Sequence, residues 1–131
     1  MTALVQQAFQ QWEDVSTAYV TFVQIDDLTS ANIQVKLMDV LDNPFAAGLS
    51  YPYYANGDAT ITSCELQVLN TVLTSYTTET ALQVFTHEIG HCLGLGHSVV
   101  EGAVMSYRDP GSVLLDDDKM ALTARYPTSD A

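Results

Sequence analysis

The chain has 131 residues, 47% of them hydrophobic, which is enough for one compact domain with a core but not for two. Its 4 lysines and arginines stand against 16 aspartates and glutamates, a formal net charge of −12 at pH 7, and so acidic a surface argues against nucleic-acid binding. No apolar run approaches the roughly 18 residues of a membrane span, so no membrane partner is expected.

The first part of the chain predicts one helix and two strands. Residues 4–14 carry apolar side chains at helical spacing, which predicts an amphipathic helix packed on the core. Residues 19–25 and 33–40 are rich in β-branched and aromatic side chains and predict strands. The Asp42-Asn43-Pro44 segment then ends the second strand and begins a loop.

Two further extended stretches are predicted, residues 48–54 and residues 59–70, with a turn at Asn56-Gly57-Asp58 between them. In the second stretch, one strand parity collects apolar side chains that would face inward together: Cys64, Leu66 and Val68. The sheet predicted so far therefore has one face directed at a core.

Two helices are predicted in the second half. The first begins near Thr78, a suitable N-cap, and its core stripe contains Leu82, Phe85, Ile89 and Leu93. The second runs from about residue 115 to Arg125. Its first turn carries three aspartates, which can satisfy free backbone N–H groups.

All three histidines of the chain lie in one segment, His87-Glu88-Ile89-Gly90-His91-Cys92-Leu93-Gly94-Leu95-Gly96-His97. Histidines four residues apart on a helix project from the same side and can hold one ion. Gly94 can adopt the positive φ that ends a helix, so that the chain turns back and presents His97. Three neutral imidazoles leave one tetrahedral position open, which is typical of a catalytic zinc.

Glu88 follows the first histidine and is rotated by about 100° around the helix. Its carboxylate could then reach a zinc-bound water without ligating the metal, which makes it the candidate general base. A surface helix can carry H-E-x-x-H by coincidence, but a third histidine placed through a glycine argues against that interpretation.

The motif resembles the signature of the metzincins, H-E-x-x-H-x-x-G-x-x-H followed by a methionine turn, here with Met105 in Ala103-Val104-Met105-Ser106-Tyr107. Ser98 and the eight positions from His97 to Met105 resemble the matrixin branch, the matrix-metalloproteinase-like enzymes. The similarity extends from about residue 4 to residue 127. By resemblance, Met105 forms a hydrophobic base beneath the metal, and a carboxylate of residues 116–118 buttresses the turn.

The resemblance implies a mixed α/β (α+β) fold: a metzincin-like catalytic domain with a twisted, mainly parallel sheet, an edge strand, an active-site helix and a C-terminal helix. Residues 1–131 would form this single domain. Residues 1–97 would contribute the sheet and the active-site helix, and residues 98–131 the methionine turn and the last helix. Matrixins usually have a strand before the first helix, whereas this chain starts at the helix.

The activity implied is that of a zinc-dependent endopeptidase acting on polypeptides. One catalytic zinc would be held by His87, His91 and His97, with Glu88 as the base. A monomer is expected, extracellular or secreted, with any signal or prosegment absent from this chain. Two alternatives stay open: a non-catalytic zinc-containing module that binds extended peptides, and a structural zinc domain whose fourth position is filled by Tyr107.

Substrate contacts are expected by resemblance on an edge strand at residues 48–53, with Leu49, Ser50 and Tyr51 as candidates, although its tyrosines could equally be ordinary sheet surface. Gln83, one turn before His87, would line the pocket for the residue after the scissile bond. Tyr107 would ligate zinc, stabilise the tetrahedral intermediate, line that pocket or simply pack.

The chain departs from matrixins where they carry a G-D-A-H-F-D-D-D-E run with a structural zinc and calcium. Here the letters are Gly57-Asp58-Ala59-Thr60-Ile61-Thr62-Ser63-Cys64-Glu65. Without a spare histidine, no second structural zinc is expected, and a calcium site is doubtful because Thr62, Ser63 and Cys64 stand in place of the aspartates. A Cys64–Cys92 disulfide, worth roughly 2–4 kcal/mol, is a hypothesis for the missing stability, and two buried thiols are the alternative.

Overall fold

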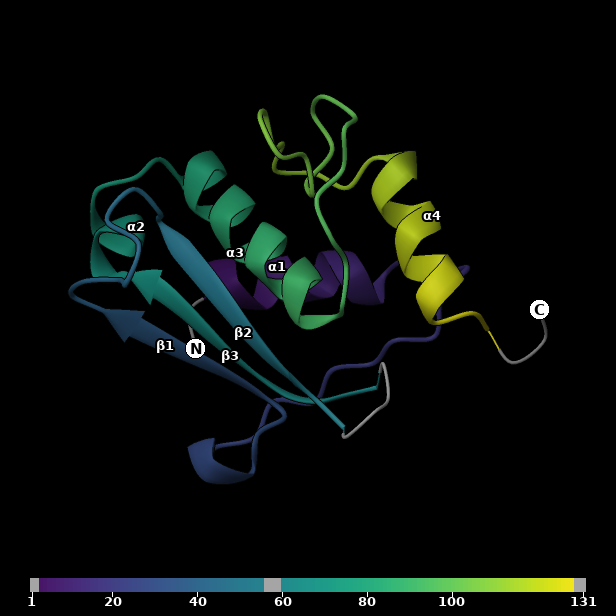
Figure 1. Ribbon diagram of the computed structural model, residues 1–131, viewed down its shortest axis with the longest axis horizontal. Coiled ribbons are helices and arrows are strands. Elements are labelled where there is room, and N and C mark those ends of the chain that lie inside the picture. The colour runs from purple at the N-terminus through teal and green to yellow at the C-terminus, as the bar shows by residue number, and fades with distance from the viewer. Residues whose placement is uncertain (1–2, 56–59, 129–131) are drawn as a thin grey trace.

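The computed structural model describes residues 3–55 and 60–128, so the turn expected at Asn56-Gly57-Asp58 lies outside the described residues. The elements, in chain order, are α1 (Ala3–Glu13), a 3₁₀ turn η1 (Leu28–Ser30), β1 (Ile33–Met38), β2 (Gly48–Tyr54), β3 (Ile61–Leu69), α2 (Asn70–Thr74), α3 (Thr78–Cys92) and α4 (Asp116–Arg125) (Figure 1). The mixed α+β class is as expected. Among these helices, none is long and apolar enough to cross a membrane.

The sheet has three strands in the order β1-β3-β2, so β3 is central and β2 is an edge strand. β1 runs parallel to β3, with Ile33 opposite Cys64, whereas β2 runs antiparallel to β3, with Ser50 opposite Leu66. Of the two strand pairings in this sheet, one is parallel and one antiparallel. The sheet is therefore mixed rather than mainly parallel.

Residues 19–25 do not form the predicted strand. Their side chains still alternate, with Val20 and Phe22 packed against the core and Tyr19 exposed. The backbone groups, however, bond elsewhere: Tyr19 N–H donates to the Tyr126 carbonyl at 2.7 Å, and Phe22 N–H donates to the Glu13 carboxylate at 2.7 Å. The pattern correctly indicated an extended chain with one buried face, but no strand lies beside it within the described residues.

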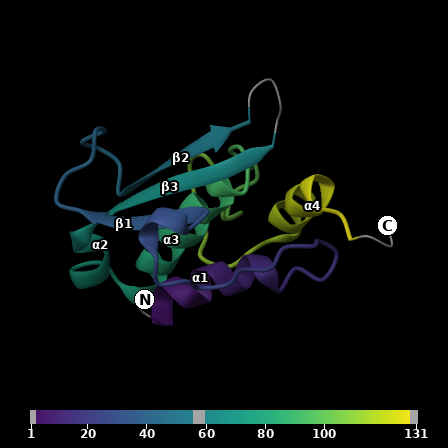
Figure 2. The same cartoon turned by 90° about the horizontal axis from the view of Figure 1, so that it is seen from below.

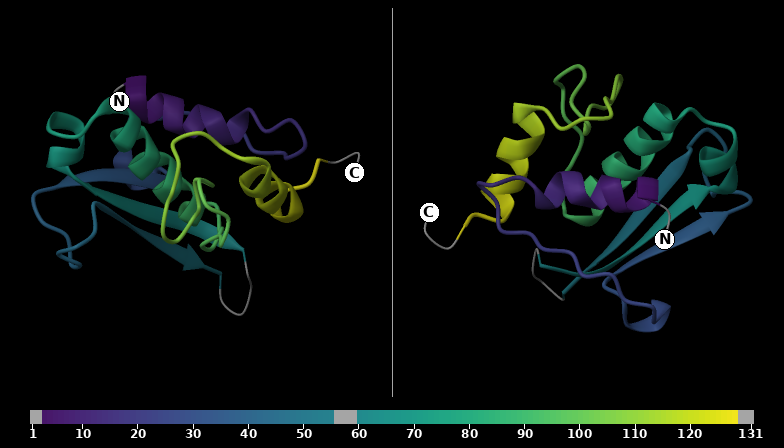
Figure 3. Two further views of the ribbon diagram at one scale, coloured as in Figure 1. Left: turned by 90° about the horizontal axis from the view of Figure 1, so that it is seen from above. Right: turned by 180° about the vertical axis from the view of Figure 1, so that it is seen from behind.

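α3 lies between the sheet and α1, and the three layers are seen from below and from above in Figures 2 and 3. The predicted inward parity of β3 is confirmed, since its buried side chains face α3. The predicted stripe of α3 is also buried. The largest fully buried side chains at these layers include Trp12, Leu66, Phe85 and Ile89.

The backbone of α3 is fixed at both ends. Its N-cap is Thr77 rather than the predicted Thr78, because the Thr77 hydroxyl accepts from Thr80 N–H at 3.2 Å. In the middle, the Trp12 indole N–H of α1 donates to the Thr86 carbonyl at 2.9 Å. At the C-terminal end, the Tyr126 hydroxyl after α4 donates to the Leu93 carbonyl at 2.7 Å. The helix that carries the histidines is thus held from several sides.

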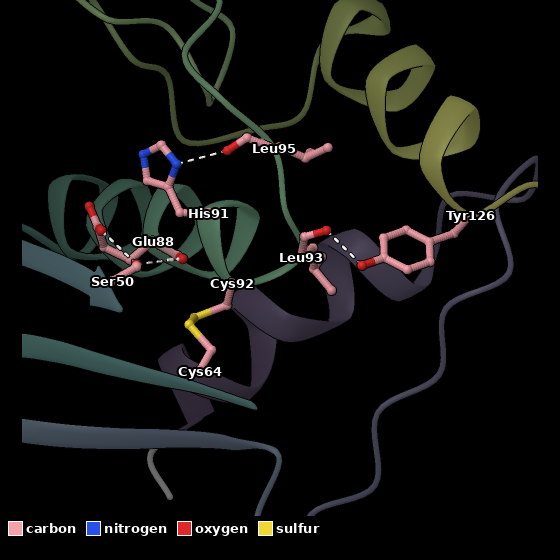
Figure 4. Close-up of a disulfide and its surroundings, with 8 residues drawn as sticks. All are labelled: Ser50, Cys64, Glu88, His91, Cys92, Leu93, Leu95 and Tyr126. Carbon is pink, nitrogen blue, oxygen red and sulfur yellow. Dashed lines mark hydrogen bonds between the residues drawn. A yellow bond between two sulfur atoms is a disulfide. The ribbon is translucent and has the colours of Figure 1, made fainter. Parts of the chain in front are cut away.

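A disulfide joins Cys64 of β3 to Cys92, the last residue of α3, with 5.5 Å between the two Cα atoms (Figure 4). Both side chains are buried. The central strand is therefore covalently attached to the end of the helix next to His91. α2, by contrast, was not expected, because the apolar pattern of β3 continues without a break to Asn70 where the helix begins.

Candidate metal centre and active site

The turn after α3 reverses the chain as the sequence predicted. Gly94 has φ +96°, a left-handed conformation that glycine adopts without strain. Gly94 N–H donates to the His91 carbonyl at 2.9 Å, and Leu95 N–H donates to the Gly90 carbonyl at 3.0 Å. This pair of bonds is the Schellman motif that ends helices. It directs the chain back so that His97 returns to the histidines of the helix.

The three imidazoles converge through their Nε2 atoms. His91 Nε2 lies 3.1 Å from His87 Nε2 and 3.2 Å from His97 Nε2. In a tetrahedral zinc site with Zn–N bonds of 2.0–2.1 Å, neighbouring nitrogens are about 3.3 Å apart. The spacing of the donor atoms therefore fits a single zinc ion held by His87, His91 and His97.

The opposite ring nitrogens are fixed by backbone carbonyls. His87 Nδ1 donates to the Val104 carbonyl at 2.6 Å. His91 Nδ1 donates to the Leu95 carbonyl at 2.8 Å, as Figure 4 shows. A carbonyl only accepts, so each Nδ1 carries the proton and each neutral ring presents an Nε2 lone pair. Nε2 lone pairs that face one another at about 3 Å repel unless a cation lies between them. The orientation of the rings, like the spacing of their nitrogens, therefore fits a bound metal ion.

Burial favours the neutral rings that a metal requires. It is the largest cause lowering the pKa of both His87 and His91 below the ordinary value. The bonds to the Val104 and Leu95 carbonyls act in the opposite direction but are smaller. These two rings are consequently prepared as ligands at neutral pH.

Glu88 lies in a nearly closed environment, with 9% of its surface exposed. The Ser50 hydroxyl of β2 is 2.8 Å from the Glu88 carboxylate oxygen Oε1 and also 2.8 Å from the Glu88 backbone carbonyl (Figure 4). Burial raises the pKa of Glu88, and the Ser50 hydrogen bond opposes that rise, as does positive charge on His91 and His97 whenever their rings are protonated. A carboxyl group with a raised pKa is well suited to accepting and releasing a proton.

Met105 is 2% exposed and lies directly against the active-site helix. A Cβ atom placed on Gly90 would collide with the Met105 sulfur and lie 2.9 Å from Trp12. The absence of a side chain at Gly90 lets the methionine pack close to the helix backbone between the two helical histidines. Met105 thus packs against Gly90, which lies between His87 and His91 in the chain.

Asp118 of α4 holds the turn that carries Met105. Its carboxylate accepts from the N–H groups of Val104 at 2.8 Å, Met105 at 3.0 Å and Leu115 at 2.9 Å. The Val104 carbonyl in turn holds the His87 ring. Asp118 therefore acts on the His87 ring through one peptide unit, and the sequence indicated the run of aspartates but not which of them does so.

The loop that carries His97 is attached to the same turn. Ser98 N–H donates to the Met105 carbonyl at 2.7 Å, and Tyr107 N–H donates to the Ser98 carbonyl at 3.0 Å. The Tyr107 ring is 71% exposed, and its centroid lies 5.2 Å from that of the His97 ring. Tyr107 thus borders the histidine cluster.

The candidate substrate residues are placed differently from one another. Ser50 contacts Glu88, whereas the Tyr51 hydroxyl donates to Asp42 at 3.2 Å. Leu49 precedes both, and its register partner Gln67 has the opposite parity to the buried residues of β3, so Leu49 lies with Tyr51 on the sheet face turned away from α3. Gln83 is half-buried on α3, one turn before His87.

Sequence reasoning placed Gly48 in the expected edge strand but missed its contact with Glu88. A Cβ atom at Gly48 would lie 2.9 Å from Cγ of Glu88 and 3.2 Å from Val84. Gly48 precedes Ser50 by two positions, so both face α3 from the edge strand. No local signal marks this contact, because it depends on how β2 is aligned with the helix.

A model of the family described as Matrixin matches residues 1–126. The chain is similar to the protein named Metalloendoproteinase 1-MMP from Arabidopsis thaliana, with 37% identity over 108 residues that cover 75% of this chain and 29% of that protein. It is also similar to a protein named Hatching enzyme from Paracentrotus lividus, with 33% identity over 127 residues that cover 89% of this chain and 21% of that protein. The chain thus spans less than a third of either relative.

Proposed function

Since this chain belongs to the matrixin family of metalloproteases, as its histidine motif indicated, we propose that it is a zinc-dependent endopeptidase that hydrolyses peptide bonds in polypeptides. One observation carries the proposal: three imidazole lone pairs converge, and a buried carboxylate that is not among them lies on the same helix. Metal binding alone needs no such carboxylate. The arrangement therefore favours catalysis over a non-catalytic peptide-binding module.

His87, His91 and His97 would hold the zinc, and the fit of their Nε2 spacing supports this assignment. When bound, zinc supplies a Lewis acid for the substrate carbonyl and lowers the pKa of water to about 7. The Val104 and Leu95 carbonyls keep the rings of His87 and His91 oriented with Nε2 toward the centre. The protein thereby fixes the position at which the scissile carbonyl has to arrive.

Glu88 would be the general base and then the general acid. Its carboxylate takes a proton from the attacking water and delivers it to the nitrogen of the leaving amine, so the proton taken in the first step is returned in the second. Burial raises the pKa of Glu88. The carboxylate therefore accepts a proton from water more readily than an exposed glutamate would, and it can still release that proton to the amine. Met105 would support the metal site from below and takes no part in proton transfer.

The edge strand β2 would bind the substrate. Its outer edge has no neighbouring strand in the described sheet, so an extended polypeptide can add to it by backbone hydrogen bonds. Leu49 and Tyr51 are the side chains proposed to flank that peptide, and Gln83 and Tyr107 are proposed to contact the residue after the scissile bond. One domain, a monomeric state and an extracellular location complete the proposal, the last supported by the disulfide, which persists in oxidising compartments.

The experiment compares Glu88→Gln with Glu79→Gln, an equivalent change at an exposed position in the first turn of the same helix. Zinc content is measured by atomic absorption and cleavage by an internally quenched peptide library. We expect both variants to retain one zinc per chain. We expect Glu88→Gln to lose cleavage by a factor of about 10² or more, the usual range for a general base, while Glu79→Gln keeps it.

Each outcome is informative. If the wild-type chain binds zinc and peptides but cleaves none of the library, the peptide-binding module replaces the proposal. If Glu88→Gln cleaves as fast as the wild type, Glu88 is not the base. If zinc is lost from the Glu88 variant as well, the carboxylate holds the site together instead of carrying protons.

A further inference from the structure

The Ser50 hydroxyl is the hydrogen-bond donor that the structure brings to the Glu88 carboxylate. It approaches Oε1 at 2.8 Å from the edge strand, and Glu88 is 9% exposed, so little water is available to replace this bond. The contact joins two elements that are 38 residues apart in the chain. The carboxylate is thereby fixed by a neighbouring strand as well as by its own helix.

Gly48 makes this approach possible. Ser50 lies opposite Leu66 and Gly48 lies opposite Val68, and both partners on β3 face α3. Any side chain at position 48 would press on Cγ of Glu88, because even a Cβ atom there would come within 2.9 Å of it. Gly48 and Ser50 together therefore form a seat on β2 into which the Glu88 side chain fits.

From this geometry we infer that Ser50 is a positioning residue for Glu88 in the hydrolysis proposed above, on which the inference rests. A glutamate side chain has three rotatable bonds. If its carboxylate populates several rotamers, it is aligned with the attacking water for only a small fraction of the time. The Ser50 bond selects one rotamer. Ser50 acts through Glu88, to which both hydrogen bonds of its hydroxyl are directed.

The Ser50 hydroxyl has a second contact, with the Glu88 backbone carbonyl, that keeps its proton bonded when the carboxylate is protonated. The hydroxyl has a single proton and two acceptors at 2.8 Å, the Glu88 carboxylate and the Glu88 carbonyl. A charged carboxylate draws that proton more strongly than a neutral carbonyl does. Once Glu88 has taken a proton from water, the hydroxyl can rotate toward the carbonyl and later return.

The same strand also links base and substrate. Ser50 belongs to β2, the edge proposed to pair with the polypeptide. A peptide added to this edge and the carboxylate seated on its inner face are thus positioned by one strand. Because the effect is on alignment of the base, it is expected in kcat and not in KM.

The test uses Ser50→Ala, which removes the hydroxyl, and Ser50→Thr, which keeps it. Ser63→Ala is the matched control, because Ser63 lies opposite Tyr53 on the sheet face turned away from α3. All are assayed as zinc-loaded protein with a quenched peptide substrate. We expect Ser50→Ala to lower kcat by about tenfold or more with KM within threefold and zinc content unchanged, and Ser50→Thr and Ser63→Ala to stay within threefold of the wild type.

A second readout does not depend on activity. The stability of Ser50→Ala, Glu88→Ala and the double variant is measured by urea unfolding with saturating zinc. If the two side chains are in direct contact, the folding equilibrium constant of the double variant should differ by at least threefold from the value that the two single variants predict together. Additive effects, an unchanged kcat in Ser50→Ala, or a Ser50→Thr variant as slow as Ser50→Ala would each overturn the inference. If the wild type cleaves nothing, the proposed function fails, and the cycle still decides whether Ser50 holds Glu88.

Discussion

Asp118→Asn is the most direct test of whether the turn that carries Met105 holds the His87 ring in place. Asp118 is 1% exposed and accepts three backbone N–H groups through two oxygens, two of them on Oδ2 and one on Oδ1. Asparagine is almost the same size but has one oxygen. Whichever way the amide is turned, at least one N–H then faces the NH₂ group and loses its acceptor.

The expected magnitude follows from those contacts. A hydrogen bond to a charged group is worth about 1.5–3 kcal/mol, and an unpaired buried donor adds a desolvation cost, so the free energy of unfolding should fall by about 2–4 kcal/mol. Zinc affinity should fall as well, because Val104, which donates to Asp118, also holds the His87 ring through its carbonyl. Loss of a supporting contact behind metal ligands typically weakens metal binding by about 10–100-fold.

The assay is urea unfolding at fixed zinc concentration together with competition for zinc against a chelating dye. Asp116→Asn is the control, since it makes the same change in the first turn of α4 at an exposed position. The reasoning is refuted if Asp118→Asn is as stable as Asp116→Asn. A variant that loses stability but binds zinc as tightly as the wild type would separate Asp118 from the metal site.

Two further predictions concern the disulfide and pH. Replacing both Cys64 and Cys92 by alanine should lower the free energy of unfolding by about 3.5 kcal/mol, the chain-entropy value for a separation of 28 residues, and urea unfolding of the variant against the oxidised wild type checks this. Because burial lowers the pKa of His87 and His91, the unfolded chain takes up protons first, so stability without zinc should fall as pH drops below about 6.5 and continue to fall toward the lowered pKa values. Zinc affinity should also decline as pH drops. A urea midpoint that does not change from pH 7.5 to pH 5 would contradict the lowered pKa of His87 and His91.

The convergence of His87, His91 and His97 could be predicted from the sequence, because the three histidines lie within eleven residues whose geometry is local. Helical spacing places His87 and His91 on one side, and a positive φ at Gly94 is sufficient to return the chain. The burial of β3 was also predictable, since strand parity alone sets it. Both features depend only on the local conformation of a few consecutive residues, which the sequence itself indicates.

The parts that could not be predicted depend on contacts distant in the chain. The composition of residues 19–25 favours a strand, yet a strand needs a neighbour, and the neighbour is not encoded in those residues. The seat formed by Gly48 and Ser50 requires the alignment of β2 with α3, which no motif records. Asp118 was one of three adjacent aspartates, and only the packing of α4 shows which one faces the turn.

The closed loop between His97 and Tyr107 has a consequence for engineering. Its two ends are joined by hydrogen bonds at Ser98, and Val99, the next residue, is 98% exposed. Residues inserted after Val99 would lengthen the loop while Ser98 keeps its backbone bonds to Met105 and Tyr107, and the entropic cost of loop closure grows only slowly with length. Recognition sequences could therefore be grafted beside the histidine cluster without displacing the third histidine.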